Sequence, residues 1–406
     1  MTRPKGVRFQ TICFVIEGLN SFALVLYNSY LFFYLRARFG FHDRDNLLVA
    51  ALLGLIYLFF AWQAGRFAQR HGYFSALKLG LTVMMLALAV GSQLGTAGGQ
   101  IAAAAAVTIG QCFTWPALEA LISESEPPAR LPHAIGMYNV TWAVTAAAAF
   151  FVGGSLVQIS FKNLFFVPLA IQAVELALVF WLQSHAAGLA RTTGADPGHS
   201  PPVTPPPDPN RPPPPKAQAF LRMAWLANPF AYIAINTLIA VIPGLAAKFQ
   251  LTPMSAGFVC SLWCFARLGA FAALWWWTDW HYRFRWLLGA YVLLIITFAA
   301  ILTAPHLAVL ITAQIFFGGS IGLLYYSSLF YSMDAGDTKG EHGGIHEAVI
   351  GLGNCVGPAT GATALWLAPG SASIGAWAVS GLLLLGLGGL CWLQVSRKPA
   401  IQTGEK

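Results

Sequence analysis

Twelve apolar segments, divided six and six by a proline-rich stretch, limit what this chain can fold into more than any other feature. A helix that spans a membrane needs about 20 predominantly apolar residues. Hydrophobic residues make up 57% of the 406 residues and charged residues only 9%, so little remains for a soluble domain. The sequence therefore predicts an all-α membrane protein with twelve transmembrane helices. We expect the spans at 9–35, 47–68, 74–94, 101–122, 134–158 and 164–185, and then at 220–247, 255–277, 286–304, 307–333, 345–368 and 371–395.

The distribution of positive charge predicts the orientation of these helices. With both termini in the cytoplasm, 17 of the 23 Lys and Arg lie on the cytoplasmic side, five lie on the other side and Arg267 lies within a span. This asymmetry follows the positive-inside rule, so we expect a multi-pass protein of the cell (inner) membrane with both termini cytoplasmic. The net charge of +8 then reflects topology and not a surface that binds nucleic acid. The expected partners are the lipid bilayer and a small-molecule substrate, and the chain is expected to be a monomer.

The proline-rich stretch predicts the domain organisation. Residues 187–217 contain 11 of the 24 prolines, a composition that favours an extended spacer over a helix. We expect an N-terminal six-helix bundle at 1–186, a cytoplasmic linker at 187–217 and a C-terminal six-helix bundle at 218–406. A docking site for a partner that recognises Pro-x-x-Pro is the alternative for the linker.

The two halves also show a weak internal similarity at an offset of about 208–210 residues. The tetrapeptide at 136–139, which opens the fifth span, corresponds to the one at 344–347, which opens the eleventh. Asn20 and Asn28 of the first span correspond to Asn228 and Asn236 of the seventh. Together with the six-plus-six count, these matches predict a parallel repeat about an axis along the membrane normal.

One turn carries a family resemblance. The turn after the second span reads Gly65-x-x-x-Gln69-Arg70-x-Gly72, which resembles the loop signature of the major facilitator superfamily. Gln69 stands where that signature has an acid, whereas Asp279 in the second half keeps the acid without the glycines. The resemblance implies two pseudo-symmetric six-helix bundles, transport by alternating access, and a loop that helps to latch the cytoplasmic ends of the bundles.

A glycine-proline motif in the eleventh span resembles another pattern of the same family. Gly353-x-x-x-Gly357-Pro358-x-x-Gly361 is similar to the antiporter motif, which normally belongs to the fifth span. Because it stands in a different span here, we interpret it as a close contact between helices and not as evidence for exchange.

Polar side chains line up on one face of four predicted helices. At 100° per residue, Glu17, Asn20, Ser21 and Asn28 share a face of the first span, and the fourth, seventh and tenth spans show similar faces. The resemblance implies that these same four helices line the central cavity. Hydrogen bonding that only joins helices is the alternative for any single residue. The candidate substrate-binding residues are Asn20, Tyr27, Asn28, Gln111, Trp115, Asn139, Asn236, Gln314 and Tyr325.

Charged residues within the spans are candidates for coupling transport to protons, because such residues are costly in a bilayer and usually functional. Glu17 lies deepest in a lining helix, and its alternative is a permanent ion pair with Arg267. Glu119 and Glu347 lie nearer the cytoplasmic face, where pairing with loop arginines is the alternative. Glu175, in a helix that the resemblance places at the periphery, is interpreted as structural or lipid-facing.

The sequence thus predicts a secondary active transporter of a small organic solute, coupled to protons. No nucleotide-binding glycine loop occurs, so the energy must come from a gradient. A drug or metabolite efflux antiporter and a non-transporting sensor or scaffold are the alternatives. An enzyme is the competing class, since His342 and His346 are one helical turn apart, but no catalytic motif supports it. We expect no cofactor and no metal site.

Overall fold

A computed structural model describes residues 5–124, 131–193, 214–335, 339–371 and 373–396 of the chain. Within these ranges the protein is helical, and twelve helical segments are long and apolar enough to cross a membrane. The predicted twelve-span, all-α fold is therefore confirmed. The helices are α1 (Lys5–Phe39), α2 (Asp43–His71), α3 (Tyr73–Gly91), α4 (Ala97–Glu124), α5 (Leu131–Ile159), α6 (Asn163–Thr193), α7 (Pro214–Lys248), α8 (Pro253–Cys260), α9 (Leu262–Trp276), α10 (Phe284–Thr303), α11 (Leu307–Ala335), α12 (Lys339–Leu367) and α13 (Ile374–Val395).

The eighth span differs from the continuous helix that the sequence predicts. It consists of α8 and α9, which are separated at Ser261. The hydroxyl of Ser261 donates a hydrogen bond to the carbonyl of Phe258 at 3.0 Å. Serine side chains that bond to a preceding carbonyl compete with the helical ladder and disturb it, which accounts for the interruption.

The helices flanking the proline-rich stretch are longer than predicted. α6 continues to Thr193 and α7 begins at Pro214, so both enter the predicted linker at 187–217. Proline is compatible with the first turn of a helix, where its missing N–H would have no partner, so α7 can begin within the proline run. Residues 194–213 of the predicted linker lie outside the described residues.

The same pairs of helices pack in both halves of the chain. α1 packs on α5 and α6, and its counterpart α7 packs on α12 and α13. α3 packs on α4 and α6, as α10 packs on α11 and α13. Each half thus builds a six-helix bundle with equivalent internal packing, which agrees with the parallel repeat expected from the sequence.

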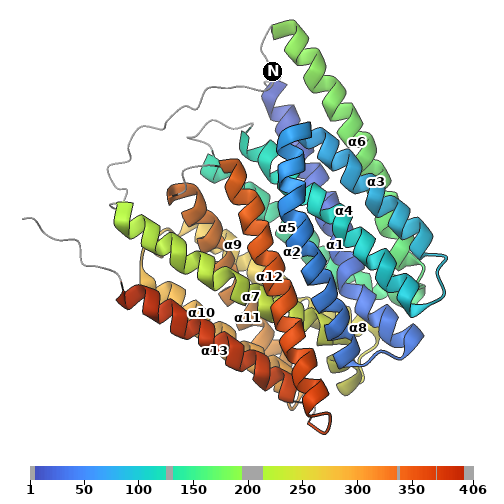
Figure 1. Ribbon diagram of the computed structural model, residues 1–406, viewed down its shortest axis with the longest axis vertical. Coiled ribbons are helices and arrows are strands. Elements are labelled where there is room, and N and C mark those ends of the chain that lie inside the picture. Colours follow the sequence, from blue (N-terminus) through green and yellow to red (C-terminus); the bar gives the residue numbers. More distant parts are fainter. Residues whose placement is uncertain (1–4, 125–130, 194–213, 336–338, 372, 397–406) are drawn as a thin grey trace, which may run out of the picture.

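Two helix pairs join the bundles. α12 of the second bundle lies along α2 of the first, and α5 of the first lies against α8 and α9 of the second (Figure 1). These two pairs are equivalent under the repeat, because α2 corresponds to α8 and α9, and α5 corresponds to α12. The interface between the bundles is therefore itself pseudo-symmetric.

Glycine allows the backbones to approach closely in both pairs. A Cβ atom added at Gly54 of α2 would lie 2.4 Å from the backbone of Asn354, and one at Gly154 of α5 would lie 2.1 Å from the carbonyl oxygen of Pro253. Neither position can hold a larger residue without separating the helices. The glycines of the predicted contact motif behave in the same way, since Gly353 and Gly357 face the backbone of α7.

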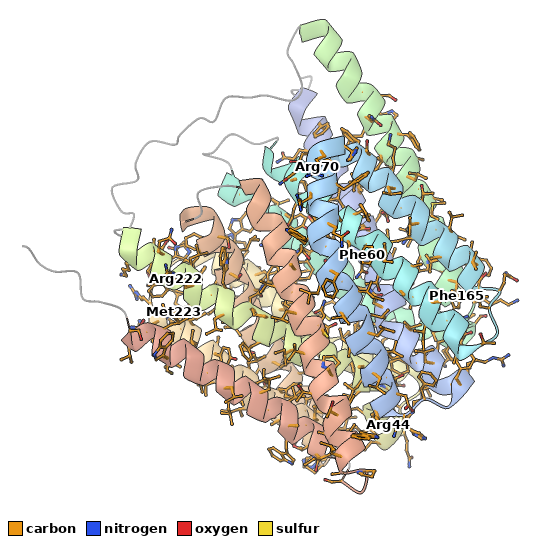
Figure 2. All side chains as sticks on the ribbon, viewed as in Figure 1. Arg44, Phe60, Arg70, Phe165, Arg222 and Met223 are labelled. Atoms are coloured by element: carbon orange, nitrogen blue, oxygen red, sulfur yellow. The ribbon has the colours of Figure 1, made fainter. Side chains whose placement is uncertain are left out.

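The bundles are joined firmly at the end of the molecule that carries Arg44. There the amide of Asn46 donates to the carbonyl oxygen of Ala240 at 3.2 Å, and Gln158 accepts from the backbone N–H of Met254 at 3.1 Å. At the other end, Arg70 of the first bundle and Arg222 of the second lie well apart (Figure 2). α2 and α7 thus converge near Arg44, where Gly244 faces Asp43, and diverge at the other end. There α5 and α9 stay in contact, with the rings of His133 and Trp275 5.3 Å apart.

Candidate functional site

Buried polar side chains gather where the two bundles meet. Glu17 and Asn20 of α1 have no exposed surface, and Glu347 of α12 is only 6% exposed. Polar groups in such a setting are costly unless they are paired or used. The candidate functional site is this buried polar region, which draws side chains from both bundles.

Three carboxyl groups form one part of the site. The hydroxyl of Ser21 donates to Glu17 at 2.8 Å, and the hydroxyl of Tyr57 donates to Glu347 across the bundle interface. The carboxyl group of Glu119 lies within electrostatic range of both Glu17 and Glu347. The structure therefore brings together the three acids that the sequence singled out, from α1, α4 and α12.

Tyrosines connect this carboxyl cluster to the rest of the site. Tyr138 of α5 lies within electrostatic range of Glu17, Glu119 and Glu347. Tyr232 of α7 and Tyr325 of α11 lie within electrostatic range both of carboxyl groups of the cluster and of the guanidinium of Arg267. The region thus runs from an acidic part, past phenol side chains, to a basic part.

Arg267 of α9 supplies the basic part. Its guanidinium carbon lies over the ring of Trp142 at 4.5 Å and over the ring of Trp263 at 4.9 Å. Trp142 belongs to α5, so this contact also crosses the bundle interface. Arg267 is 6% exposed, and its Nε has no hydrogen-bond partner among the described residues.

The predicted alternative, a permanent ion pair between Glu17 and Arg267, is not formed. Glu17 bonds with Ser21, and no carboxylate of the described residues lies within ion-pair distance of Arg267. A cation–π contact contributes about 0.5–2 kcal/mol. Burying an ion costs several kcal/mol even after relaxation, so two indole rings compensate the guanidinium only in part.

Several candidate binding residues are joined in pairs. Asn28 donates to Gln111 at 3.0 Å, linking α1 to α4 within the first bundle. Trp142 donates through its Nε1 to Asn139 at 3.1 Å. Asn236 of α7 donates to Asn354 of α12. These three pairs agree with the alternative interpretation of such residues as bonds between or along helices.

Other candidates form no such pair among the described residues. Both polar atoms of the Asn20 side chain and the Nε2 of Gln314 have no hydrogen-bond partner among the described residues. Trp115 packs beside Tyr57 and Ile350 near the bundle interface. Tyr27, in contrast, packs edge-on against Phe165 of α6, inside the first bundle and not between the bundles.

The loop signature lies at the end of the molecule where α2 and α7 diverge. α2 ends at His71, and Gly72 follows with a φ of 87°, a conformation that favours glycine. Gly65 is half-buried in the last turns of α2, and Gln69, Arg70 and Asp279 are exposed. The signature therefore forms a tight turn between α2 and α3.

The structure adds residues that sequence reasoning missed. Tyr57, Tyr138, Trp142 and Trp263 are part of the site, but none lies on the four helices whose polar faces were aligned. Aromatic residues are abundant in this chain, at 14%, and many of them pack in the hydrophobic core. From the sequence, only the expectation that a buried arginine requires an interacting side chain could have suggested a residue such as Trp142.

Catalytic and metal chemistry finds no further support in the described part of the chain. No group of three or more His, Cys, Asp or Glu that could hold a metal ion occurs among the described residues. The side chains of His342 and His346 lie outside what the structure describes. Cys260 and Cys264 are buried and free.

Comparisons with known proteins agree with this architecture. A family model described as the Major Facilitator Superfamily matches residues 11–358. The human organic anion transporter MFSD10 (TETRAN) superimposes with a TM-score of 0.68 at 17% identity, over 96% of this chain and 100% of that one. A structure of proton dependent oligopeptide transporters superimposes with a TM-score of 0.68 at 13% identity, over 96% and 98% of the two chains. A bacterial homologue of the human lysosomal transporter Spinster, captured inward-facing and unoccupied, superimposes with a TM-score of 0.65 at 14% identity, over 97% and 96%. No curated protein matches the sequence.

Proposed function

The chain belongs to the major facilitator superfamily, and from that premise we propose that it is a secondary active transporter that couples the movement of a small organic solute to protons. The two bundles would rock about the buried polar region, which would face each side of the membrane in turn. The proton dependence of the oligopeptide transporters belongs to those proteins, and for this chain the proposal rests on its own side chains.

The observation that carries the proposal is the carboxyl cluster at the bundle interface. Glu17 and Glu119 come from the first bundle and Glu347 from the second, and the bond from Tyr57 to Glu347 joins the two. A rocking motion would change the distances within this cluster. Since the charge state of a carboxyl group depends on neighbouring charges, such a change can drive uptake and release of a proton.

The predicted orientation relates the closed end of the molecule to a state of the transport cycle. If both termini face the cytoplasm, the end that carries Arg44 lies on the opposite side of the membrane. The structure would then correspond to a state that is closed to the outside, because Asn46 and Gln158 hold the bundles together there. The motion that opens the protein to the outside must break these two hydrogen bonds.

Substitution of Glu17 tests the proton coupling. Purified protein is first screened for solutes that raise its thermal stability, because a ligand of the folded state does so by mass action. In proteoliposomes, Glu17→Gln should abolish accumulation of that solute driven by a pH gradient but retain exchange of solute across the membrane. The variant keeps the size of the side chain and loses its ability to titrate.

Asp45→Asn is the matched control, because Asp45 is a surface acid paired with Arg44 at 3.1 Å. This variant should accumulate solute like the wild type. Unchanged pH-driven accumulation in Glu17→Gln would eliminate Glu17 as a proton carrier. Absence of any flux in the wild type, for solutes that bind, would favour a sensor or scaffold.

A further inference from the structure

We propose that Arg267 binds the carboxylate of a planar aromatic anion, and that this anion is the solute of the transporter. The inference deepens the proposed function, on which its second half rests. Its first half concerns binding alone and can be tested without transport.

The setting of Arg267 leaves its donors available to a ligand. A guanidinium carries five N–H donors in a planar fork that matches the two oxygens of a carboxylate. Arg267 is 6% exposed, its Nε has no hydrogen-bond partner among the described residues, and no described acid pairs with it. The indole rings of Trp142 and Trp263 interact with its positive charge but accept no hydrogen bond from its N–H groups. A ligand carboxylate would satisfy both the charge and these donors.

The surroundings of the guanidinium favour a flat, apolar ligand body. The ring of Trp142 lies 5.4 Å from that of Tyr325 and 5.6 Å from that of Phe271. The ring of Tyr232 lies 6.4 Å from that of Tyr325. Ligand sites of this kind combine aromatic walls with a few polar groups that fix orientation. A carboxylate held at Arg267 would therefore bring an aromatic ring against aromatic walls.

The charge balance of the site distinguishes an anion from a zwitterion. Glu17 and Glu347 are buried and no described cation lies within ion-pair distance of them, a setting that favours the neutral, protonated form of a carboxyl group. A single negative charge on the solute would then match the positive charge of Arg267. An amine on the solute would need an ionised carboxylate, which this setting disfavours.

Binding of matched acids and amides tests the inference. The probes are benzoate and 3-phenylpropionate, their amides benzamide and 3-phenylpropanamide, and phenylalanine, which adds an amine to 3-phenylpropionate. Affinity is measured by calorimetry on detergent-purified wild type, Arg267→Gln, Arg267→Lys and Arg285→Gln. Arg285 is the matched control, because it is exposed and lies over Trp286 at 5.7 Å in the same bundle.

At least one acid should bind the wild type, and its amide should bind at least about tenfold more weakly, because a charged hydrogen-bonded contact is lost. Arg267→Gln should weaken the acid by a similar factor, Arg267→Lys by less, and Arg285→Gln not at all. The empty Arg267→Gln protein should melt at the same temperature as the wild type or higher, since a partly compensated charge has been removed. A purely structural arginine would instead lower the melting temperature of the empty protein.

Three binding results would each overturn the inference. They are binding of no acid by the wild type, equal binding of acids and amides, or tighter binding of phenylalanine than of 3-phenylpropionate. The comparison of acids with amides on the wild type decides the matter even if Arg267→Gln does not fold. Proton-driven transport of a neutral solute, unaffected by Arg267→Gln, would refute the inference and leave the proposed function standing. Binding that depends on Arg267, without any flux of the solute, would support the binding half of the inference and refute the proposed transport function.

Discussion

At the scale of single residues, this protein is distinguished by ionisable groups that it buries without an opposite charge. Arg267 lies on two indole rings, and Glu175 of α6 has no exposed surface. Both carboxyl oxygens of Glu175 lack a hydrogen-bond partner among the described residues, and its carboxyl group lies within electrostatic range of that of Glu17. The expectation that Glu175 faces lipid is wrong, because α6 turns this residue toward the inside of the first bundle. The structural interpretation stays a prediction.

Glu175→Leu tests that interpretation. Replacing a buried polar group that lacks partners by an apolar one is often neutral or stabilising, so the variant should unfold at the same temperature or higher. The expected gain is about 1–3 kcal/mol. Thermal unfolding followed by size-exclusion chromatography measures this, and solute flux should be unchanged. A folded Glu175→Leu protein that has lost transport would instead place Glu175 in the path of the proton.

At the scale of helices, glycines determine how closely the bundles approach. α5 and α8 touch through Gly154 and Gly257, and a Cβ atom at Gly154 would collide with the carbonyl of Pro253. The contact holds the end of the molecule near Arg44 closed. Any added methyl group must therefore push this end open.

Gly154→Ala should shift the protein toward the state that is open at this end. Asn46→Cys reports the change, because residue 46 has no exposed surface and lies at the interface. With the exposed Cys391 replaced by serine, Asn46→Cys should react faster with a maleimide in the Gly154→Ala protein than without it.

Gly289→Ala is the matched control, since a Cβ atom there would meet nothing within 4 Å. It should leave labelling unchanged and stabilise α10 by about 0.5–1 kcal/mol, as glycine is a weak helix former. Equal labelling in a folded Gly154→Ala protein would contradict the role of this contact.

The elements themselves could be predicted well from the sequence, and their ends less well. Long apolar runs specify membrane helices because the bilayer demands about 20 apolar residues and internal hydrogen bonds. α6 extends to Thr193 and α7 begins at Pro214 because these residues continue a helix that is already formed, and not because they are apolar. The interruption at Ser261 depends on one side-chain bond, which no hydropathy pattern contains.

The site was predictable only in part. A helical wheel identifies the inward face of α1 and α4, and Glu17 and Glu119 do lie together. It says nothing about the rotation of one bundle relative to the other. The contacts of Glu347 with Tyr57 and of Arg267 with Trp142 depend on that rotation, so they required the structure.

At the scale of the whole molecule, α2 and α7 define a converging end near Arg44 and a diverging end near Arg70 and Arg222. The predicted topology assigns the diverging end, with Arg70 and Arg222, to the cytoplasm (Figure 2). This assignment depends on the unequal distribution of Lys and Arg, with 17 of 23 on one side.

Two glutamines provide a matched test of the topology. Gln69 lies at the end of α2 and Gln93 in the turn after α3, and both are exposed. In intact cells, with Cys391 replaced by serine, an impermeant maleimide should label Gln93→Cys. Gln69→Cys should react only after the cells are broken. The opposite pattern would invert the topology and with it the side on which the structure is closed.

The position of α12 has a consequence for how freely this sequence can change. Gly351 faces α2 while Gly353 and Gly357 face α7, so one helix is held by backbone contacts on two sides at once. α2 of the first bundle and α7 of the second therefore constrain different faces of residues 351–357. At these three glycines there is no side chain that could adjust to a substitution in either partner helix. This short segment should be the slowest part of the chain to diverge, even though it carries none of the carboxyl groups of the site.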